Sequence, residues 1–510
     1  MALMILASTA GVRRATLLAA ESASDVTAAR ATDEAGRAYT IARIPKSQAV
    51  RIDAYTIRGS WGVPLEVVHE DEDAYEVKMY TSTSSRPTIL AATPEPSPAT
   101  GAAKDEQPKT RTSRRLRFRA FGSGLPTSGQ WREGFGIADM NGDGHPDLVH
   151  GPARKTLGAP VVFLGDGRGS WQRWSEAHFP AGLYDYGDAQ AADLDGDGRP
   201  DVVFAMHLHG LRALLNDGRG GFSDASAGLD FAAESRDATF TSHAIALADW
   251  DGDGKPDIIA LGEGPRLALG PGSRAATAPN QIVVYLNRGT RWERRDADPP
   301  SPIFGSAVTV ADFDGDGRLD FATASGMFGR TDLVNLGRPD GGWTATKVPV
   351  SSQAYVTAVA ARDVDGDGRA DLAVGYLERA GANWRTAIDV LFPRAGGTWE
   401  RRPLFAEAGR TSVPALAIGD VDGDGHADVV ALTGDGDTLV FSGDGHGRFA
   451  REIGAVPRFP GGCQGAHVAL ADLDGDGRDE IVASFAEERS SVAEAGRCPS
   501  SGGISAWKLQ

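Results

Sequence analysis

A nine-residue acidic loop recurs seven times along the chain, in the pattern D-x-[DN]-G-D-G-x-x-[DE]. The copies begin at Asp139, Asp193, Asp249, Asp312, Asp363, Asp420 and Asp472, at intervals of 51 to 63 residues. Periods of this length are typical of stacked repeat units, each too small to bury its own apolar face. The repeat therefore predicts an architecture made of seven similar units.

The composition of the loop indicates a calcium site. In the second copy, D-L-D-G-D-G-R-P-D, carboxylates stand at positions 1, 3, 5 and 9, and glycines at positions 4 and 6 allow the sharp turn that brings the oxygens together. The backbone carbonyl at position 7 supplies a further oxygen. Flexible all-oxygen sites suit Ca²⁺, whereas Zn²⁺ prefers Cys and His, and neither stands at the four side-chain positions.

The predicted ligand set consists of positions 1, 3, 5 and 9, with position 7 contributing its carbonyl, for up to seven Ca²⁺ ions. Its members are Asp139, Asn141, Asp143, His145, Asp147, Asp193, Asp195, Asp197, Arg199, Asp201, Asp249, Asp251, Asp253, Lys255, Asp257, Asp312, Asp314, Asp316, Arg318, Asp320, Asp363, Asp365, Asp367, Arg369, Asp371, Asp420, Asp422, Asp424, His426, Asp428, Asp472, Asp474, Asp476, Arg478 and Glu480. Two side chains depart from Asp, and we expect weaker or shifted binding at Asn141 and Glu480.

The net charge supports the presence of a cation. Seven Ca²⁺ ions would change the formal charge from −17 to roughly −3, and clustered carboxylates without a cation disfavour their own ionisation. An EF-hand is a poor alternative, because that loop closes with Glu at position 12 and is flanked by helices. The other alternative is that the Asp-Gly runs are solvated turns.

The residues around each loop alternate with the period of a β-strand. Before the first Asp of five units, large apolar residues stand at positions −4 and −2 with mostly small residues between them, as in residues 244–248 and 307–311. Downstream, six units carry a Gly-rich turn followed by an aromatic residue, namely Trp171, Phe222, Trp292, Trp343, Trp399 and Phe449. Four strands per unit, arranged radially, form the blade of a β-propeller.

The two ends of the repeat region complement each other. The seventh unit ends after residues 504–509 without its last strand, and residues 117–125 resemble residues 222–229, which follow the Gly-rich turn of the second unit. We therefore expect residues near 114–120 to supply the outer strand of the last blade, which closes the ring and removes exposed strand edges. The prediction is an all-β fold in which residues 114–510 form a seven-bladed propeller.

Two sequence segments show a resemblance to a known family. A-D-L-D-G-D-G-R-P-D and L-L-N-D-G-R-G-G-F resemble FG-GAP/VCBS repeats, the units of integrin α-subunit propellers and of some secreted lectins. The resemblance covers nearly 400 residues and implies calcium sites on one face and ligand binding on the other. Members of this group include adhesion modules, sugar-binding proteins and propellers with lyase or dehydratase activity, so the function must be argued from the site.

The N-terminal part lacks the loop. Residues 1–37 include a short apolar stretch, for which a degraded or truncated signal peptide and a disordered N-terminus are both open readings. Residues 38–82 are predicted to form a small β-rich unit with strands at 39–44, 49–52 and 75–80, and residues 83–113 read as a Pro/Ser/Thr/Ala linker. No apolar run is long enough for a transmembrane helix, and the acidic charge disfavours nucleic acid as a partner.

The two cysteines are informative about the cellular compartment of the protein. Cys463 and Cys498 fall in connections that we expect on the face opposite the acidic loops, where either a disulfide or two thiols would be consistent with the sequence. A disulfide together with low-affinity calcium sites would indicate a secreted, cell-surface or periplasmic protein.

The face opposite the loops offers candidates for ligand binding. They are Trp131, Tyr184, Tyr186, His243, Phe304, Tyr355 and His467, with Glu133, Asp185 and Asp188 nearby. The alternative is that these aromatic residues pack blade against blade. The insertion at 261–281 is expected to be a surface loop with binding potential. His207 and His209 alternate along the chain, but a metal pair would need a third ligand that the sequence does not identify.

Three functions remain open at this level. The first is an extracellular calcium-binding module for a glycan or a protein ligand. The second is a carbohydrate-active enzyme of the lyase or dehydratase type on the same propeller, although we assign no catalytic residue. The third is a structural protein of the cell surface or envelope. The oligomeric state is open.

Overall fold

The computed structural model describes two units of the chain, residues 1–109 and 110–510, each considered by itself. In the first unit it describes the backbone of six strands between residues 29 and 80. In the second it describes residues 116–510 except for 155–157, 208, 232–239, 264–281, 301–302, 326, 382, 410, 461–462, 488–497 and 499. Much of the predicted N-terminal stretch 1–37, the linker 83–113 and most of the insertion 261–281 therefore lie outside the described residues.

The six strands of the first unit form one antiparallel sheet in the order β1-β2-β6-β5-β4-β3. They are β1 Ala29–Thr32, β2 Ala38–Pro45, β3 Ala49–Asp53, β4 Thr56–Gly59, β5 Leu65–Glu70 and β6 Ala74–Tyr80. Strands β2, β3 and β6 coincide with the three strands expected from residues 39–44, 49–52 and 75–80. The sequence pattern did not identify β1, β4 or β5.

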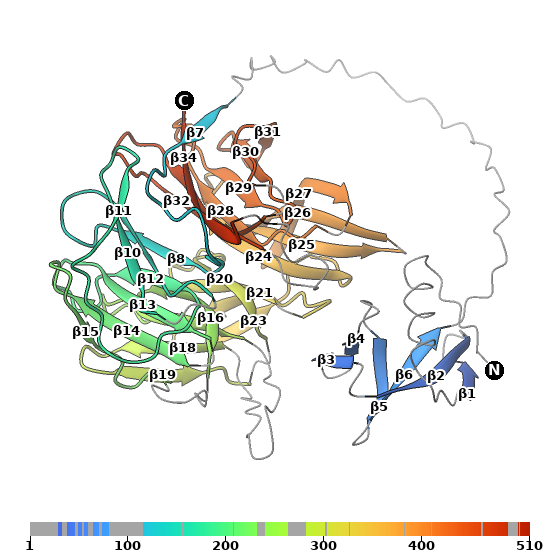
Figure 1. Cartoon of the computed structure of the whole chain (residues 1–510). Helices are drawn as coiled ribbons and strands as arrows, with labels where there is room; N and C mark the ends of the chain where they lie inside the picture. The colour runs from blue at the N-terminus through green and yellow to red at the C-terminus, as the bar shows by residue number, and fades with distance from the viewer. Residues whose placement is uncertain are drawn as a thin grey trace, which may run out of the picture. The chain divides into compact units, whose positions relative to one another are not determined.

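The second unit is a seven-bladed β-propeller, as predicted, and each blade is a four-stranded antiparallel sheet (Figure 1). The blades, in chain order, are β8 Phe135–Ala138, β9 Asp147–His150, β10 Val161–Gly165 and β11 Trp171–Arg173; β12 Ala189–Ala192, β13 Asp201–Met206, β14 Gly210–Asn216 and β15 Phe222–Asp224; β16 Ser242–Ala248, β17 Asp257–Gly262, β18 Ile282–Asn287 and β19 Trp292–Asp296; β20 Gly305–Ala311, β21 Asp320–Ser325, β22 Val334–Gly337 and β23 Trp343–Thr346; β24 Ala354–Arg362, β25 Asp371–Ala380, β26 Asn383–Arg394 and β27 Thr398–Ala408; β28 Ala415–Gly419, β29 Asp428–Leu432, β30 Thr438–Gly443 and β31 Phe449–Glu452; and β32 Gln464–Ala471, β33 Glu480–Ala486, β34 Gly502–Leu509 and β7 Phe118–Ala120.

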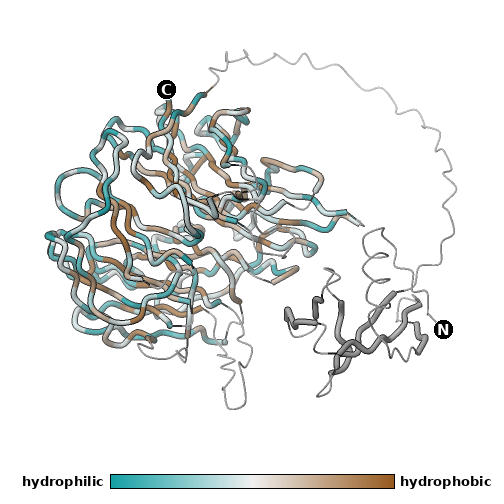
Figure 2. The backbone as a smooth tube through the Cα atoms, viewed as in Figure 1, coloured by the Kyte–Doolittle hydropathy of each residue, from teal (hydrophilic) through white to brown (hydrophobic). Residues whose placement is uncertain are grey.

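The hydrophobic core lies between blades. The second and third strands of the third blade are almost continuously apolar, and every residue of β17 and β18 is buried, which is the pattern of a strand covered on both faces. One apolar cluster joins Val203 of the second blade to Ile258 and Tyr285 of the third. Figure 2 shows brown segments along the strands and teal segments at the turns. Each blade is therefore held mainly by its neighbours rather than by a core of its own.

The ring is closed by a strand from the beginning of the propeller. Strand β7 pairs with β34, and Leu509 lies opposite Phe118 in the register. The side chain of Phe118 is 4% exposed and belongs to an apolar cluster that includes Val421 and Trp507 of the sixth and seventh blades. This confirms the predicted closure and leaves the last blade with no unpaired edge at β34.

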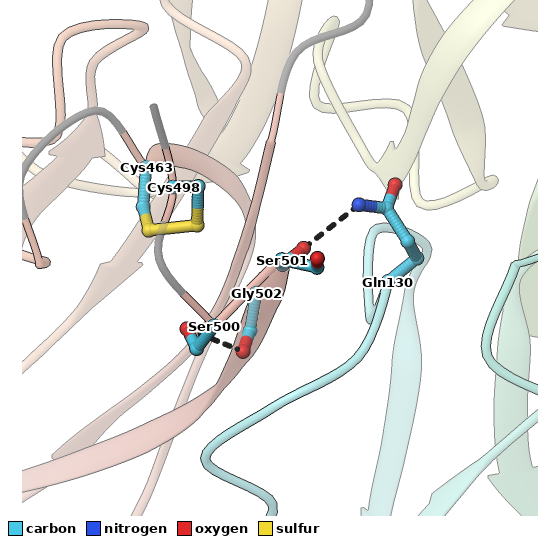
Figure 3. Close-up of a disulfide and its surroundings, with 6 residues drawn as sticks. All are labelled: Gln130, Cys463, Cys498, Ser500, Ser501 and Gly502. Carbon is cyan, nitrogen blue, oxygen red and sulfur yellow. Dashed lines mark hydrogen bonds between the residues drawn. A yellow bond between two sulfur atoms is a disulfide. The ribbon is translucent and has the colours of Figure 1, made fainter. Parts of the chain in front are cut away.

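Cys463 and Cys498 form a disulfide within the seventh blade (Figure 3). Their Cα atoms are 4.5 Å apart, and the bond links the residue just before β32 to the connection that leads into β34. Nearby, Gln130 Nε2 donates to the carbonyl of Ser501 at 2.8 Å. A cross-link over a sequence separation of 35 residues stabilises a fold by roughly 3–4 kcal/mol, chiefly by restricting the unfolded chain.

The part of the chain that the structure describes contains no helix that is long and apolar enough to cross a membrane.

Candidate calcium loops and an axial cavity

Each acidic loop connects the first and second strands of its blade. In the second blade, the carboxylate of Asp193 accepts hydrogen bonds from Gly196 N at 2.8 Å and from Gly198 N at 2.9 Å. Both glycines have positive φ angles, 82° and 85°, which a residue with a side chain rarely adopts. The turn itself thus accounts for the first Asp and the two glycines of the pattern, because the first carboxylate organises the backbone of the loop.

The carboxylate at position 9 ties the loop to the third strand. Asp201 is fully buried; its Oδ2 atom accepts from Leu194 N at 2.9 Å and its Oδ1 atom from Asn216 N at 2.7 Å. Burial raises the pKa of this carboxyl to about 6 and that of its counterpart Asp428 to about 7, and the neighbouring loop carboxylates add to both shifts. Position 9 therefore has a structural role in addition to the predicted metal role, which the sequence pattern alone did not reveal.

Several loops place three carboxylates within reach of one ion. In each group, one oxygen per residue lies within 4.8 Å of the others. The groups are Asp193, Asp195 and Asp197; Asp249, Asp251 and Asp257; Asp312, Asp314 and Asp316; and Asp363, Asp365 and Asp371. Among the described residues, the Oδ1 atoms of Asp365, Asp371 and Asp474 are buried without a hydrogen-bond donor. An all-oxygen donor set with unpaired buried oxygens fits Ca²⁺.

Basic side chains partly neutralise these loops. At position 7, Lys255 Nζ lies 3.0 Å from Asp253 Oδ2, and Arg478 contacts Asp476 in the same way at 2.7 Å. Three loops receive a second cation from the third strand or the turn after it: Arg288 contacts Asp251 at 2.7 Å, Arg394 contacts Asp365 at 3.0 Å, and Lys508 contacts Asp476 at 2.7 Å. A metal ion at the third, fifth or seventh loop would have to compete with this second cation.

A cavity of about 480 Å³ lies along the axis of the ring, bounded by the first strands. Its lining follows the repeat: the residue five positions before the first Asp of the loop lines the cavity in all seven blades. These residues are Gly134, Asp188, Ala244, Ala307, Ala358, Ala415 and His467. Because each first strand ends at its acidic loop, these positions lie toward the other end of the strand. A small residue, Gly or Ala, occupies this position in five blades, and Asp188 and His467 are the two exceptions.

Asp188 and His467 approach each other across the first blade. A Cβ atom placed on Gly134 would lie 1.9 Å from Asp188 Oδ1 and 3.3 Å from His467 Cε1, so glycine is required between them. Asp188 accepts from Ile245 N at 3.0 Å, and burial raises its pKa to about 7. Burial lowers the pKa of His467 to about 4, so its ring is neutral at physiological pH.

β-bulges direct further side chains toward the axis. The register between the first and second strands shifts at His243, Ser306, Thr357 and Ala466, and each of these residues lines the cavity. All four stand six positions before the first Asp of their loop, as do the lining residues Glu133 and Pro414. A bulge re-aims the extra residue, which is why period-two alternation could not assign these side chains to a face. Their fixed offset from the loop is the signal that would have found them.

The predicted ligand residues separate into two groups. His243, Tyr355 and His467 line the axial cavity. The other four do not line this cavity. Trp131 lies edge-on to His150, Tyr184 is buried beneath Arg212, and Tyr186 stacks on His207. Phe304 is half-buried. Asp185 accepts a hydrogen bond from the backbone of Tyr186. Of His207 and His209, His207 contacts His243.

Comparison with known proteins gives the family. The FG-GAP-like repeat family model matches residues 139–204, 193–260, 275–323 and 420–483, and the FG-GAP repeat model matches residues 355–383. A chain in the crystal structure of BBS1N in complex with ARL6DN, soaked with mercury, is 12% identical with a TM-score of 0.43, over 77% of this chain and 94% of that chain. No curated protein matches the chain. The FG-GAP repeat models match segments along the chain, and the structure has seven four-stranded blades. The chain therefore belongs to the FG-GAP repeat family and is a seven-bladed β-propeller.

Proposed function

We propose that the protein is an extracytoplasmic binding module, whose acidic loops hold Ca²⁺ and whose axial cavity takes a glycan ligand. The observation that carries the proposal is the cavity, because its volume of about 480 Å³ lies in the range typical of sites for small ligands. The calcium loops are at one end of the first strands and the polar cavity lies toward the other. This separation supports a structural role for the metal and a recognition role for the cavity.

The lining of the cavity suits a ligand rich in hydroxyl groups. Hydroxyl and amide side chains reach it from five blades: Gln190, Ser306, Thr309, Thr357, Ser412 and Gln464. They can both donate and accept hydrogen bonds, as sugar hydroxyls do. Tyr355 adds an aromatic ring that is 36% exposed, and such a ring offers an apolar face with a polar edge. Arg132 and Glu133 bring charge to the same wall.

The proposed compartment rests on the disulfide and the metal. Disulfides persist in oxidising compartments, and calcium sites of low affinity fill where calcium is abundant. The Cys463–Cys498 bond and the FG-GAP propeller both support a secreted, cell-surface or periplasmic location.

The glycan proposal is tested with an array of glycans and polysaccharides, probed with the full chain in millimolar calcium. We expect saturable binding of a defined sugar, and we expect Tyr355→Ala to weaken it about tenfold, because losing one exposed aromatic contact at a binding site typically costs 1–2 kcal/mol. Phe328→Ala is the matched control. Phe328 is 48% exposed but lies outside the lining of the cavity, so this variant should bind within about twofold of the wild type.

Two results would redirect the proposal. If the folded, calcium-loaded chain binds no glycan, the ligand is a protein and the next step is a search for that partner. If instead a polysaccharide changes with time, through chain shortening or a new unsaturated product, the protein is an enzyme of the lyase or dehydratase type. Saturable binding of an unchanged sugar is the result that supports the module.

A further inference from the structure

We infer that His207, His243 and Glu263 form a separate metal site, which takes a divalent cation of the zinc class at the wall of the axial cavity. His207 follows β13 in the second blade, His243 lies in β16, and Glu263 follows β17 in the third blade. The site thus bridges two blades and shares no residue with the acidic loops. It does not depend on the proposed glycan function.

The nitrogen atoms of the two histidines and the two carboxylate oxygens of Glu263 lie near the spacing of a tetrahedral site. His207 Nδ1 lies 3.1 Å from His243 Nε2 and 3.0 Å from Glu263 Oε2, and His243 Nε2 lies 3.4 Å from Glu263 Oε1. Around a zinc ion with bonds of 2.0–2.2 Å, tetrahedral geometry places the ligand atoms about 3.3–3.5 Å from one another. Two of the observed separations are slightly shorter than this value and the third falls within it, so small movements of the side chains would be enough to seat an ion.

Hydrogen bonds alone leave one of these contacts unexplained. If both rings donate to Glu263, two N–H donors face each other across the 3.1 Å between His207 and His243. If one ring donates to the other, the accepting nitrogen presents a lone pair to the carboxylate instead. A cation bound by two neutral imidazoles and one carboxylate satisfies all three contacts together, and this His₂Glu set is one that zinc uses in proteins.

The surroundings hold each ligand in place. His207 N donates to Tyr186 O at 2.9 Å, and Glu263 N donates to Thr241 O at 3.1 Å, so both backbones are fixed at the ends of their strands. The ring of His207 stacks on Tyr186 with centroids 4.7 Å apart. His243 is the bulged residue of β16, and the bulge turns its side chain toward this group. Ligand side chains held in this way favour metal binding, because they lose little conformational entropy when the ion binds.

The exposure of the ligands indicates an open coordination position. Glu263 is 9% exposed, whereas the two rings are 27% and 28% exposed, so the cluster has a buried side and a solvent side. Three protein ligands with a further position left for water or a ligand atom are typical of zinc sites that act on a bound molecule. Because His243 also lines the axial cavity, an oxygen of a ligand in the cavity could reach that position.

The experiment is a zinc titration of the full chain by calorimetry, with millimolar calcium present to saturate the acidic loops. We expect one site per chain, and His243→Ala and Glu263→Gln should each weaken it at least tenfold, since each removes or neutralises a ligand. His446→Ala, which removes an exposed histidine elsewhere, should bind within about twofold of the wild type. Cobalt in place of zinc should give the visible absorption of a tetrahedral ion, a readout that needs no activity.

The variants are compared only after thermal melting in calcium shows that they fold. Glu263→Gln preserves the shape of the side chain and remains informative if His243→Ala does not fold. Zinc binding that is equal in the wild type, His243→Ala and Glu263→Gln would place the ion elsewhere and overturn the inference. Absence of zinc binding by the folded wild type would overturn it as well.

Discussion

Removal of calcium is expected to lower the melting temperature of the protein by more than about 10 °C. A ligand present at 100 times its dissociation constant stabilises the folded state by about 2.7 kcal/mol per site, and the chain offers seven loops. Without the cation, each loop keeps several carboxylates together, and a position-9 carboxyl such as Asp201 stays buried. Both effects destabilise the folded state and leave the unfolded chain unaffected.

The measurement is a thermal melt in millimolar calcium and again in excess chelator. Magnesium at the same concentration is the control, because Mg²⁺ requires a tighter octahedral shell and gives up its waters reluctantly. Magnesium should restore only a small part of the lost stability. Melting curves that coincide in calcium and in chelator would contradict the assignment of the loops as calcium sites.

The second large effect is expected where the ring closes. Phe118→Ala should reduce the free energy of unfolding by about 3–5 kcal/mol, which is the usual effect of truncating a buried Phe. Phe118 is 4% exposed and packs with Val421 and Trp507, so its loss weakens the attachment of β7 to the last two blades. The measurement is denaturation by urea in millimolar calcium.

Ala120→Ser is the control for this variant. Ala120 lies on the same short strand and pairs with Trp507 in the register, but its side chain is exposed. A surface change of this kind should alter the stability by no more than about 0.5 kcal/mol. If Phe118→Ala were as stable as Ala120→Ser, β7 would not be closing the propeller.

The fold could be predicted because each repeat contains the sequence signals of one blade. The strand alternation before each Asp, the Gly-rich turn and the following aromatic residue recur in the sequence, and together they define a blade. The closing strand was found because residues 117–125 resemble a segment of the second unit. In each case the information is local and repeated, so a single sequence was sufficient.

The cavity and the histidine cluster were harder to predict from the sequence. The bulge at His243 breaks the alternation that assigns side chains to faces, and only its fixed offset from the loop, compared across the seven units, points to it. His207 and Glu263 are 56 residues apart, and they meet only because two blades pack side by side. Asp188 and His467 were among the residues named on the face opposite the loops, but alignment of the seven units on their loops is needed to see that they are exceptions to a small-residue position.

The basic residues around the loops predict two classes of calcium site. In the third, fifth and seventh loops a second cation, from Arg288, Arg394 or Lys508, contacts the carboxylates. Partly exposed ion pairs such as those of Arg288 and Arg394 are worth about 1 kcal/mol or less, so displacing one of them weakens calcium binding by roughly fivefold at most. These three sites, together with the first loop and its neutral Asn141, should therefore be weaker than the others but still fill in millimolar calcium.

The most direct test is the number of calcium ions bound per chain, measured by elemental analysis after equilibrium dialysis. We expect seven ions in millimolar calcium, with those of the first, third, fifth and seventh loops lost first as calcium is lowered. Asp197→Ala, which removes the carboxylate at position 5 of the second loop, should reduce the count by one. Asp340→Ala, at an exposed carboxylate outside the loops, should leave it unchanged. Two ions or fewer in the folded wild type, or a count that Asp197→Ala does not change, would contradict the account.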